Sequence, residues 1–245
     1  MANSFSFNSV DMADYGLRLR RHDEPFAQET EGLQLLDRAH GLGSRRPAVT
    51  IDLAVVVVAA SFAALVSNLD DIKAALNYRT EKSLAFDSVT DRYWLARFKS
   101  ITKTAGTATT WEGAIAFDIF DPAAYATAET DHDHTVDEDP ETVTETASGT
   151  EQAQPFITLT CDSTLTAATV EIENETSGET IEWTGDLVAN DVLTIDCETG
   201  VVKLNGVEDM ETVDGQFLHL LAGDNSIVIT GFSGNLNFTY RARYV

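Results

Sequence analysis

The residues best suited to chemistry lie in one acidic stretch. Asp131-His132-Asp133-His134 alternates carboxylates with imidazoles. Alternate residues of a strand share a face, so two imidazoles there would suit a divalent ion. The alternative, which we favour, is a solvated acidic segment with two incidental histidines; the EF-hand spacing is not met. We therefore predict no bound metal, and name Asp131, His132, Asp133 and His134 as weak candidates.

Catalytic and cofactor motifs are missing from the sequence. There is no nucleophile elbow, no cysteine beside a histidine, no Walker loop and no dinucleotide fingerprint. Gly41-Leu42-Gly43 with Arg45 and Arg46 could hold a phosphate, but an ordinary turn or interface loop explains it better. Forty carboxylates guarantee chance acid pairs, so they do not indicate a glycosidase. The sequence predicts a protein without catalytic residues or cofactors; a hydrolase is kept as an alternative.

Aromatic and cysteine residues of the second half fit a core. Trp183 and Tyr240 could stack on a sugar, which keeps a stand-alone carbohydrate-binding module as an alternative function, but a Trp in a β-sandwich more often lies in the core. Cys161 and Cys197 follow alternating apolar patterns, so we expect reduced, buried thiols. A disulfide between their strands is the alternative.

The charge is strongly negative and unevenly distributed. Forty acids and 16 bases give −24, which opposes compaction in dilute buffer and is screened at molar salt. We interpret this as adaptation to brine; the alternative is simply an acidic protein. Residues 1–125 carry 13 bases and 16 acids, whereas residues 126–240 carry 24 acids and one base, Lys203. An acidic surface disfavours nucleic-acid binding, and the contrast indicates two domains with different neighbours.

The elements expected in the first half are strands and one helix. We predict strands at 5–7, 17–19, 48–59, 93–100 and 111–120, with the Val55–Val58 run buried on both faces. Residues 61–77 show apolar residues at helical spacing, with Ser61 and Asn77 as caps. The buried face would contain Phe62, Leu65, Val66, Leu69, Ile72 and Leu76. The longest apolar stretch is too short for a membrane span, so no membrane insertion is expected.

The second half is predicted to form short strands separated by turns. Residues 126–152 are an acidic linker or a hairpin. From residue 155 onward, turn residues recur about every ten positions, which is typical of a β-sandwich. A final strand at 238–245 can pack on either domain. The predicted domains are therefore 1–125 and 126–245, in a mainly β chain with one helix.

An ordered set of fragments resembles the distal tail proteins of long-tailed (siphovirus-like) viruses. In the first half these are Ser4–Val10, Asp14–Leu17, the strand–helix unit 48–77, Leu84–Asp87, Asp91–Trp94 and Phe117–Pro122. In the second half they are Ile172–Asn174, Leu193–Asp196, Gly200–Val202, Asn205–Gly206, Leu221–Ile227 and Tyr240–Tyr244. The region 37–43 departs from the glycine-rich loop of many members.

The resemblance implies a structural role at the tail tip of a virion. The first domain would be a β-barrel or sandwich that forms a homohexameric ring between the tail-tube protein and the baseplate hub. The second would be a galectin-like sandwich that carries tail-fibre or receptor-binding proteins. Assembly would occur in the host cytoplasm, and the brine adaptation suggests a virus of halophilic archaea. Arg18, Arg20, Arg21, Arg45 and Arg46 are the interface candidates.

Overall fold

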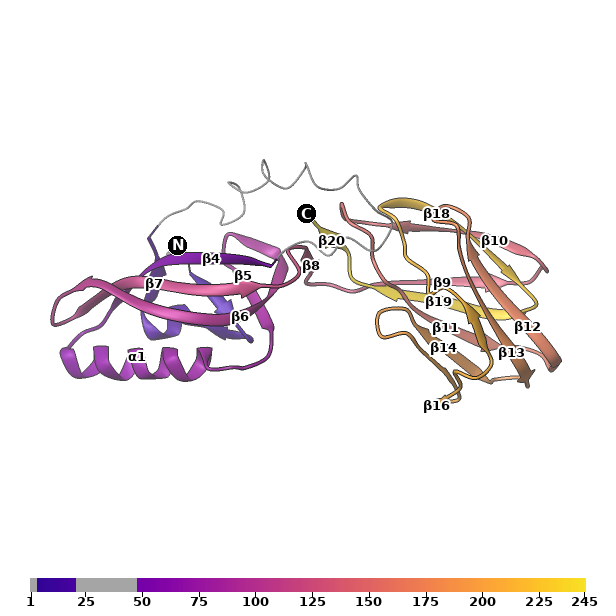
Figure 1. The fold of residues 1–245 in the computed structure, drawn as a ribbon, viewed down its shortest axis with the longest axis horizontal. Helices are drawn as coiled ribbons and strands as arrows, with labels where there is room; N and C mark the ends of the chain where they lie inside the picture. Colours follow the sequence, from indigo (N-terminus) through magenta and orange to yellow (C-terminus); the bar gives the residue numbers. More distant parts are fainter. Residues whose placement is uncertain (1–3, 21–47) are drawn as a thin grey trace. The chain divides into compact units, whose positions relative to one another are not determined.

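The computed structural model describes residues 4–20 and 48–245, and the chain divides into two compact units, residues 1–124 and 125–245. Most of the described residues are in antiparallel strands, and one α-helix is present among them (Figure 1). The predicted mainly β fold with one helix is confirmed. No helix in the described ranges is long and apolar enough to cross a membrane.

The first unit is built around one antiparallel sheet. Its strands are ordered β2-β1-β5-β6-β7-β4-β3. Phe5, Phe7 and Phe117 pack their rings together in its core, with centroids 5.2 to 5.8 Å apart where Phe117 meets the other two. The strands are β1 (Phe5–Phe7), β2 (Val10–Asp11), β3 (Leu17–Leu19), β4 (Val49–Val58), β5 (Lys82–Phe86), β6 (Val89–Gly106) and β7 (Thr110–Ile119).

Strand β4 corrects one prediction. Val55 and Val57 are fully buried, but Val58 is 46% exposed and Val56 is intermediate. The run therefore alternates, because β4 lies in an antiparallel sheet between β3 and β7 and buries one face only. The turn before β3 is tight: Gly16 has φ 72°, and a Cβ there would lie 2.4 Å from the carbonyl oxygen of Val58 on β4. A short 3-10 helix, Met12–Tyr15, leads into that glycine.

Helix α1 (Phe62–Leu76) lies along one face of this sheet (Figure 1). Ser61 is its N-cap, as predicted: its hydroxyl accepts a hydrogen bond from the Ala64 amide at 3.2 Å. Leu65, Ile72 and Leu76 are buried, but Leu69 is only partly buried and the other two residues of the predicted apolar face are exposed. Phe62 is 65% and Val66 43% exposed. A helix on a sheet buries only a narrow stripe, and the predicted face was wider than that stripe.

The second unit is a sandwich of a five-stranded and a six-stranded antiparallel sheet. Their orders are β10-β18-β12-β13-β17 and β16-β15-β14-β11-β19-β9. The core between them contains Trp183, Phe238, Tyr240 and both cysteines. The strands are β9 (Thr130–Val136), β10 (Glu141–Ala147), β11 (Phe156–Cys161), β12 (Leu165–Asn174), β13 (Glu179–Leu187), β14 (Val192–Asp196), β15 (Val201–Leu204), β16 (Val207–Glu208), β17 (Val213–Gly215), β18 (Gly223–Thr230) and β19 (Gly234–Tyr240).

Residues 126–152 are neither a linker nor a hairpin. They contain β9, which pairs with β19, and β10, which pairs with β18 in the opposite sheet. In both strands the residues alternate between an inward and an outward face. Only the inward residues must suit a core, so the many acidic residues on the outward face do not prevent strand formation. The C-terminal segment also differs from the single strand predicted: β19 ends at Tyr240, and a separate strand β20 (Arg243–Tyr244) pairs with β8 (Ala124–Ala126).

Candidate functional site

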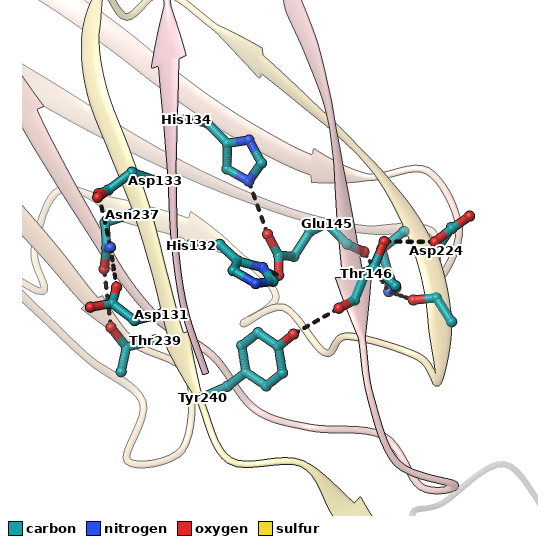
Figure 2. Close-up of polar contacts among 12 residues, drawn as sticks. Asp131, His132, Asp133, His134, Glu145, Thr146, Asp224, Asn237, Thr239 and Tyr240 are labelled. Carbon is teal, nitrogen blue, oxygen red and sulfur yellow. Dashed lines mark hydrogen bonds and ion pairs between the residues drawn. The ribbon is translucent and has the colours of Figure 1, made fainter. Parts of the chain in front are cut away.

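A cluster of titratable side chains joins the two edge strands β9 and β10. Glu145 lies on β10 with its side chain fully buried. Nδ1 of His132 is 2.7 Å from Oε1 of Glu145, and Nε2 of His134 is 2.9 Å from Oε2. Figure 2 shows both imidazoles on β9 directed at this one carboxyl group. We refer to His132, His134 and Glu145 as the His–Glu–His clamp.

The local pattern explains how the clamp forms. Residues i and i+2 of a strand share a face, so His132 and His134 point together into the sandwich. On β10 the inward residues are Val143, Glu145 and Ala147, and all three are buried. The clamp thus bridges an edge of the six-stranded sheet and an edge of the five-stranded sheet, and no strand pairing in the described part of the chain joins these two edges.

The electrostatics of the clamp follow from its burial. An ionised carboxylate only accepts hydrogen bonds, so an imidazole pairs with it through a ring nitrogen that carries a proton. Neither a lysine nor an arginine contacts Glu145 among the hydrogen bonds and ion pairs of the described residues. A buried carboxylate is costly without such partners, so the two imidazoles are the groups that offset its desolvation.

Tyr240 completes the surroundings of the clamp. Its hydroxyl donates to the carbonyl oxygen of Thr146 at 2.9 Å (Figure 2). Burial, followed by the nearby negative charge of Glu145, raises the pKa of the Tyr240 hydroxyl above its ordinary value. Asn225 also contacts the backbone of β10: its Nδ2 donates a hydrogen bond to the carbonyl oxygen of Glu145 at 3.3 Å.

The four weak metal candidates are divided between the two faces of β9. His132 and His134 point into the sandwich, whereas Asp131 and Asp133 both accept hydrogen bonds from Nδ2 of Asn237 (Figure 2). Over residues 4–20 and 48–245, no three His, Cys, Asp or Glu side chains are arranged to hold a metal ion. Both oxygens of Glu145 are engaged by imidazoles, so the arrangement suits structural bridging.

The interface candidates that the structure describes are two. Arg18 on β3 is exposed, and Nη1 of Arg20 forms an ion pair with Glu112 at 2.9 Å. Arg20 is therefore engaged within its own chain. Arg21, Arg45 and Arg46, together with the glycine loop 41–43, lie outside the described residues.

The candidate sugar-stacking aromatics belong to the core. Trp183 is 2% and Tyr240 3% exposed, and Nε1 of Trp183 donates to Asp209 at 3.1 Å. Both cysteines are free thiols and buried, as predicted. They lie at opposite ends of the paired strands β11 and β14, since Phe156 faces Asp196 and Thr160 faces Val192. Burial raises the pKa of the Cys197 thiol to about 12.

Reasoning from the sequence missed Glu145. A signal was present: Glu145 occupies the inward position between Val143 and Ala147 in a strand that otherwise alternates regularly. It also missed Asn174 and Asn225, which are fully buried and hydrogen-bonded to each other at 3.1 Å. An Asn within a β-pattern carries little information by itself, because its partner lies 51 residues away.

Comparisons with known proteins agree on the kind of fold. Residues 148–244 match the family described as "Siphovirus-type tail component, C-terminal domain". The crystal structure of the Dit protein (gp 19.1) of phage SPP1 is similar over 100% of both chains, with a TM-score of 0.74 and 14% identity. No curated protein matches the sequence.

Two baseplate structures show a weaker likeness. A chain of the phage P2 baseplate, in its activated conformation with Ca, gives a TM-score of 0.51 at 12% identity, covering 99% of this chain and 98% of that one. The corresponding structure with Sr gives 0.50 at 12% identity, with 98% and 97% covered. The chain therefore has the fold of a phage distal tail protein, and its residues 148–244 match the C-terminal domain of a siphovirus-type tail component.

Proposed function

We propose that this chain is a structural subunit of a viral tail tip, where six copies form a ring between the tail tube and the baseplate hub. The observation that carries the proposal is the likeness to SPP1 Dit over the full length of both chains, together with the family match of the C-terminal segment. SPP1 Dit itself is described as a paradigm of the hub adsorption apparatus in phages that infect Gram-positive bacteria.

The distribution of charge supports different roles for the two units. The nearly neutral first unit would form the ring, because closely packed copies of one unit tolerate little net charge. The acidic second unit would face solvent and carry fibre or receptor-binding proteins. In the second unit, Glu182 lies directly opposite both Glu171 and Asp214. Like charges that face each other on neighbouring strands destabilise a sheet unless salt screens them. This arrangement therefore favours a virion adapted to high salt and a halophilic archaeal host.

The test of the ring is the mass of the purified protein in about 2 M NaCl, measured by light scattering. A mass of six 26.7 kDa chains, with a ring visible by negative-stain microscopy, is the expected result. Antibody labelling of virions should then mark the tail tip. A chain that neither forms rings alone nor assembles on tail-tube ends, and that is missing from virions, would refute the proposal.

A further inference from the structure

Helix α1 presents a second stripe of side chains that its own unit leaves uncovered. Phe62, Val66, Leu69 and Lys73 follow one another at intervals of four, three and four residues, so they lie along one side of the helix. Phe62 is 65% and Val66 43% exposed. We call these four residues the α1 stripe. It is distinct from the buried stripe of Leu65, Ile72 and Leu76.

The stripe continues into a pocket against the β6–β7 hairpin. This pocket has a volume of about 190 Å³ and is lined by Leu69, Lys73, Ile101, Lys103 and Trp111. Its lining is apolar with two ammonium groups. Lys73 pairs with Asp70 on the exposed helix surface, at 3.1 Å. Among the ion pairs and hydrogen bonds of the described residues, none involves the side chain of Lys103.

Such a surface fits a partner that is apolar at its centre and acidic around it. An exposed Phe and Val beside an apolar pocket are typical of an interaction site. Lys103 would attract carboxylates, and residues 1–125 of a second copy carry 16 acids. At molar salt, long-range repulsion between two such acidic chains is screened, whereas pairs in contact persist better.

We propose that the α1 stripe and its pocket form the docking surface for a second copy of this chain. The inference rests on the proposed ring: a closed ring of more than two copies needs a heterologous contact, in which this surface meets a different, acidic surface of the neighbouring copy. The stripe thereby adds a candidate ring contact in the first unit to the exposed Arg18 and Arg20.

The experiment compares two double variants of the full chain by light scattering in about 2 M NaCl. Phe62→Ser with Val66→Ser removes the apolar part of the stripe. Val188→Ser with Val207→Ser is the matched control, because these valines are 52% and 71% exposed in the second unit. All four side chains are exposed, so circular dichroism and thermal unfolding should match the wild type in both variants.

We expect the wild type and the control to form rings, and the stripe variant to associate about tenfold more weakly or worse. Lys103→Glu should weaken association in the same direction. If the stripe variant forms rings like the wild type, the inference is wrong while the proposed function stands. If the stripe variant forms rings but no longer binds tail-tube ends, the occupant is the tube protein and this inference is likewise overturned. A wild type that never self-associates, alone or on tubes, removes both proposals.

Discussion

At the scale of single residues, Glu145 shows how a charged side chain enters a small β-sandwich. Its carboxyl group is fully buried, and it is held by two imidazoles that reach solvent, since His132 is 46% and His134 20% exposed at the side chain. The histidines can be hydrated if Glu145 is removed. Glu145 has no exposed surface of its own, so it depends on the two imidazoles more than they depend on it. This asymmetry predicts unequal costs for removing the two sides of the clamp.

We expect His132→Ala with His134→Ala to lower the free energy of unfolding by about 3 kcal/mol or more, because it leaves a buried charge without partners. Glu145→Gln should cost only about 1 kcal/mol, since an amide can still bond to both rings. Denaturant titration in 2 M NaCl measures both. Glu179→Gln, which alters a second Glu–His contact of 2.8 Å with His219, is the control. A larger loss for Glu145→Gln than for the double variant would contradict this account of the clamp.

The two buried thiols lead to a second residue-scale prediction. Burial raises the pKa of the Cys197 thiol to about 12, so almost none of it is ionised at pH 8. Only thiolates attack a disulfide reagent, so Cys197 should not react in the folded protein over hours. Both cysteines should react fully once denaturant unfolds the chain. Rapid labelling of Cys197 at pH 8 without denaturant would show that the C-terminal unit opens easily.

At the scale of elements, the outer face of β12, β13 and β17 carries acids in direct register. Glu171 lies opposite Glu182, and Glu182 lies opposite Asp214. Facing like charges on neighbouring strands destabilise a sheet unless ions screen them. The core beneath these strands, which includes Trp183 and Ile181, must therefore supply the stability that this surface opposes in dilute buffer.

Glu182→Lys should raise the free energy of unfolding by about 0.5 to 1 kcal/mol near 0.1 M NaCl, because it converts two repulsions into attractions. The gain should largely vanish near 2 M NaCl. Glu211→Lys makes the same change of charge in the loop between β16 and β17, so it controls for net charge. Equal stabilisation by the two variants would mean that overall charge, and not the strand register, governs the effect.

At the scale of the whole molecule, the two units have separate cores and very different charge. Residues 126–240 carry 24 acids and one base, against 16 acids and 13 bases in residues 1–125. Salt should therefore stabilise the second unit far more than the first. Hydrogen exchange at 0.2 M and 2 M NaCl can resolve the units. Protection should rise mainly in strands β9 to β19, and an equal rise in β1 to β7 would contradict the prediction.

Much of the fold could be predicted because strands and helices produce periodic patterns in the local sequence. Alternation located strands such as β1, β3, β4 and β7, and helical spacing with Ser61 as cap located α1. Turn residues at regular intervals indicated the sandwich of the second unit. These features depend on neighbours within a few positions of the chain, where side-chain periodicity and backbone preferences act directly.

The tertiary structure alone decided which polar residues lie together. The sequence showed His132 and His134 sharing a face, but only the pairing of β9 with β19 and of β10 with β18 brings them to Glu145. It likewise decided that Phe62 and Val66 remain outside the buried stripe of α1. Both outcomes depend on contacts between distant segments, and a strand's pattern specifies its inward face without specifying which strand lies across from it.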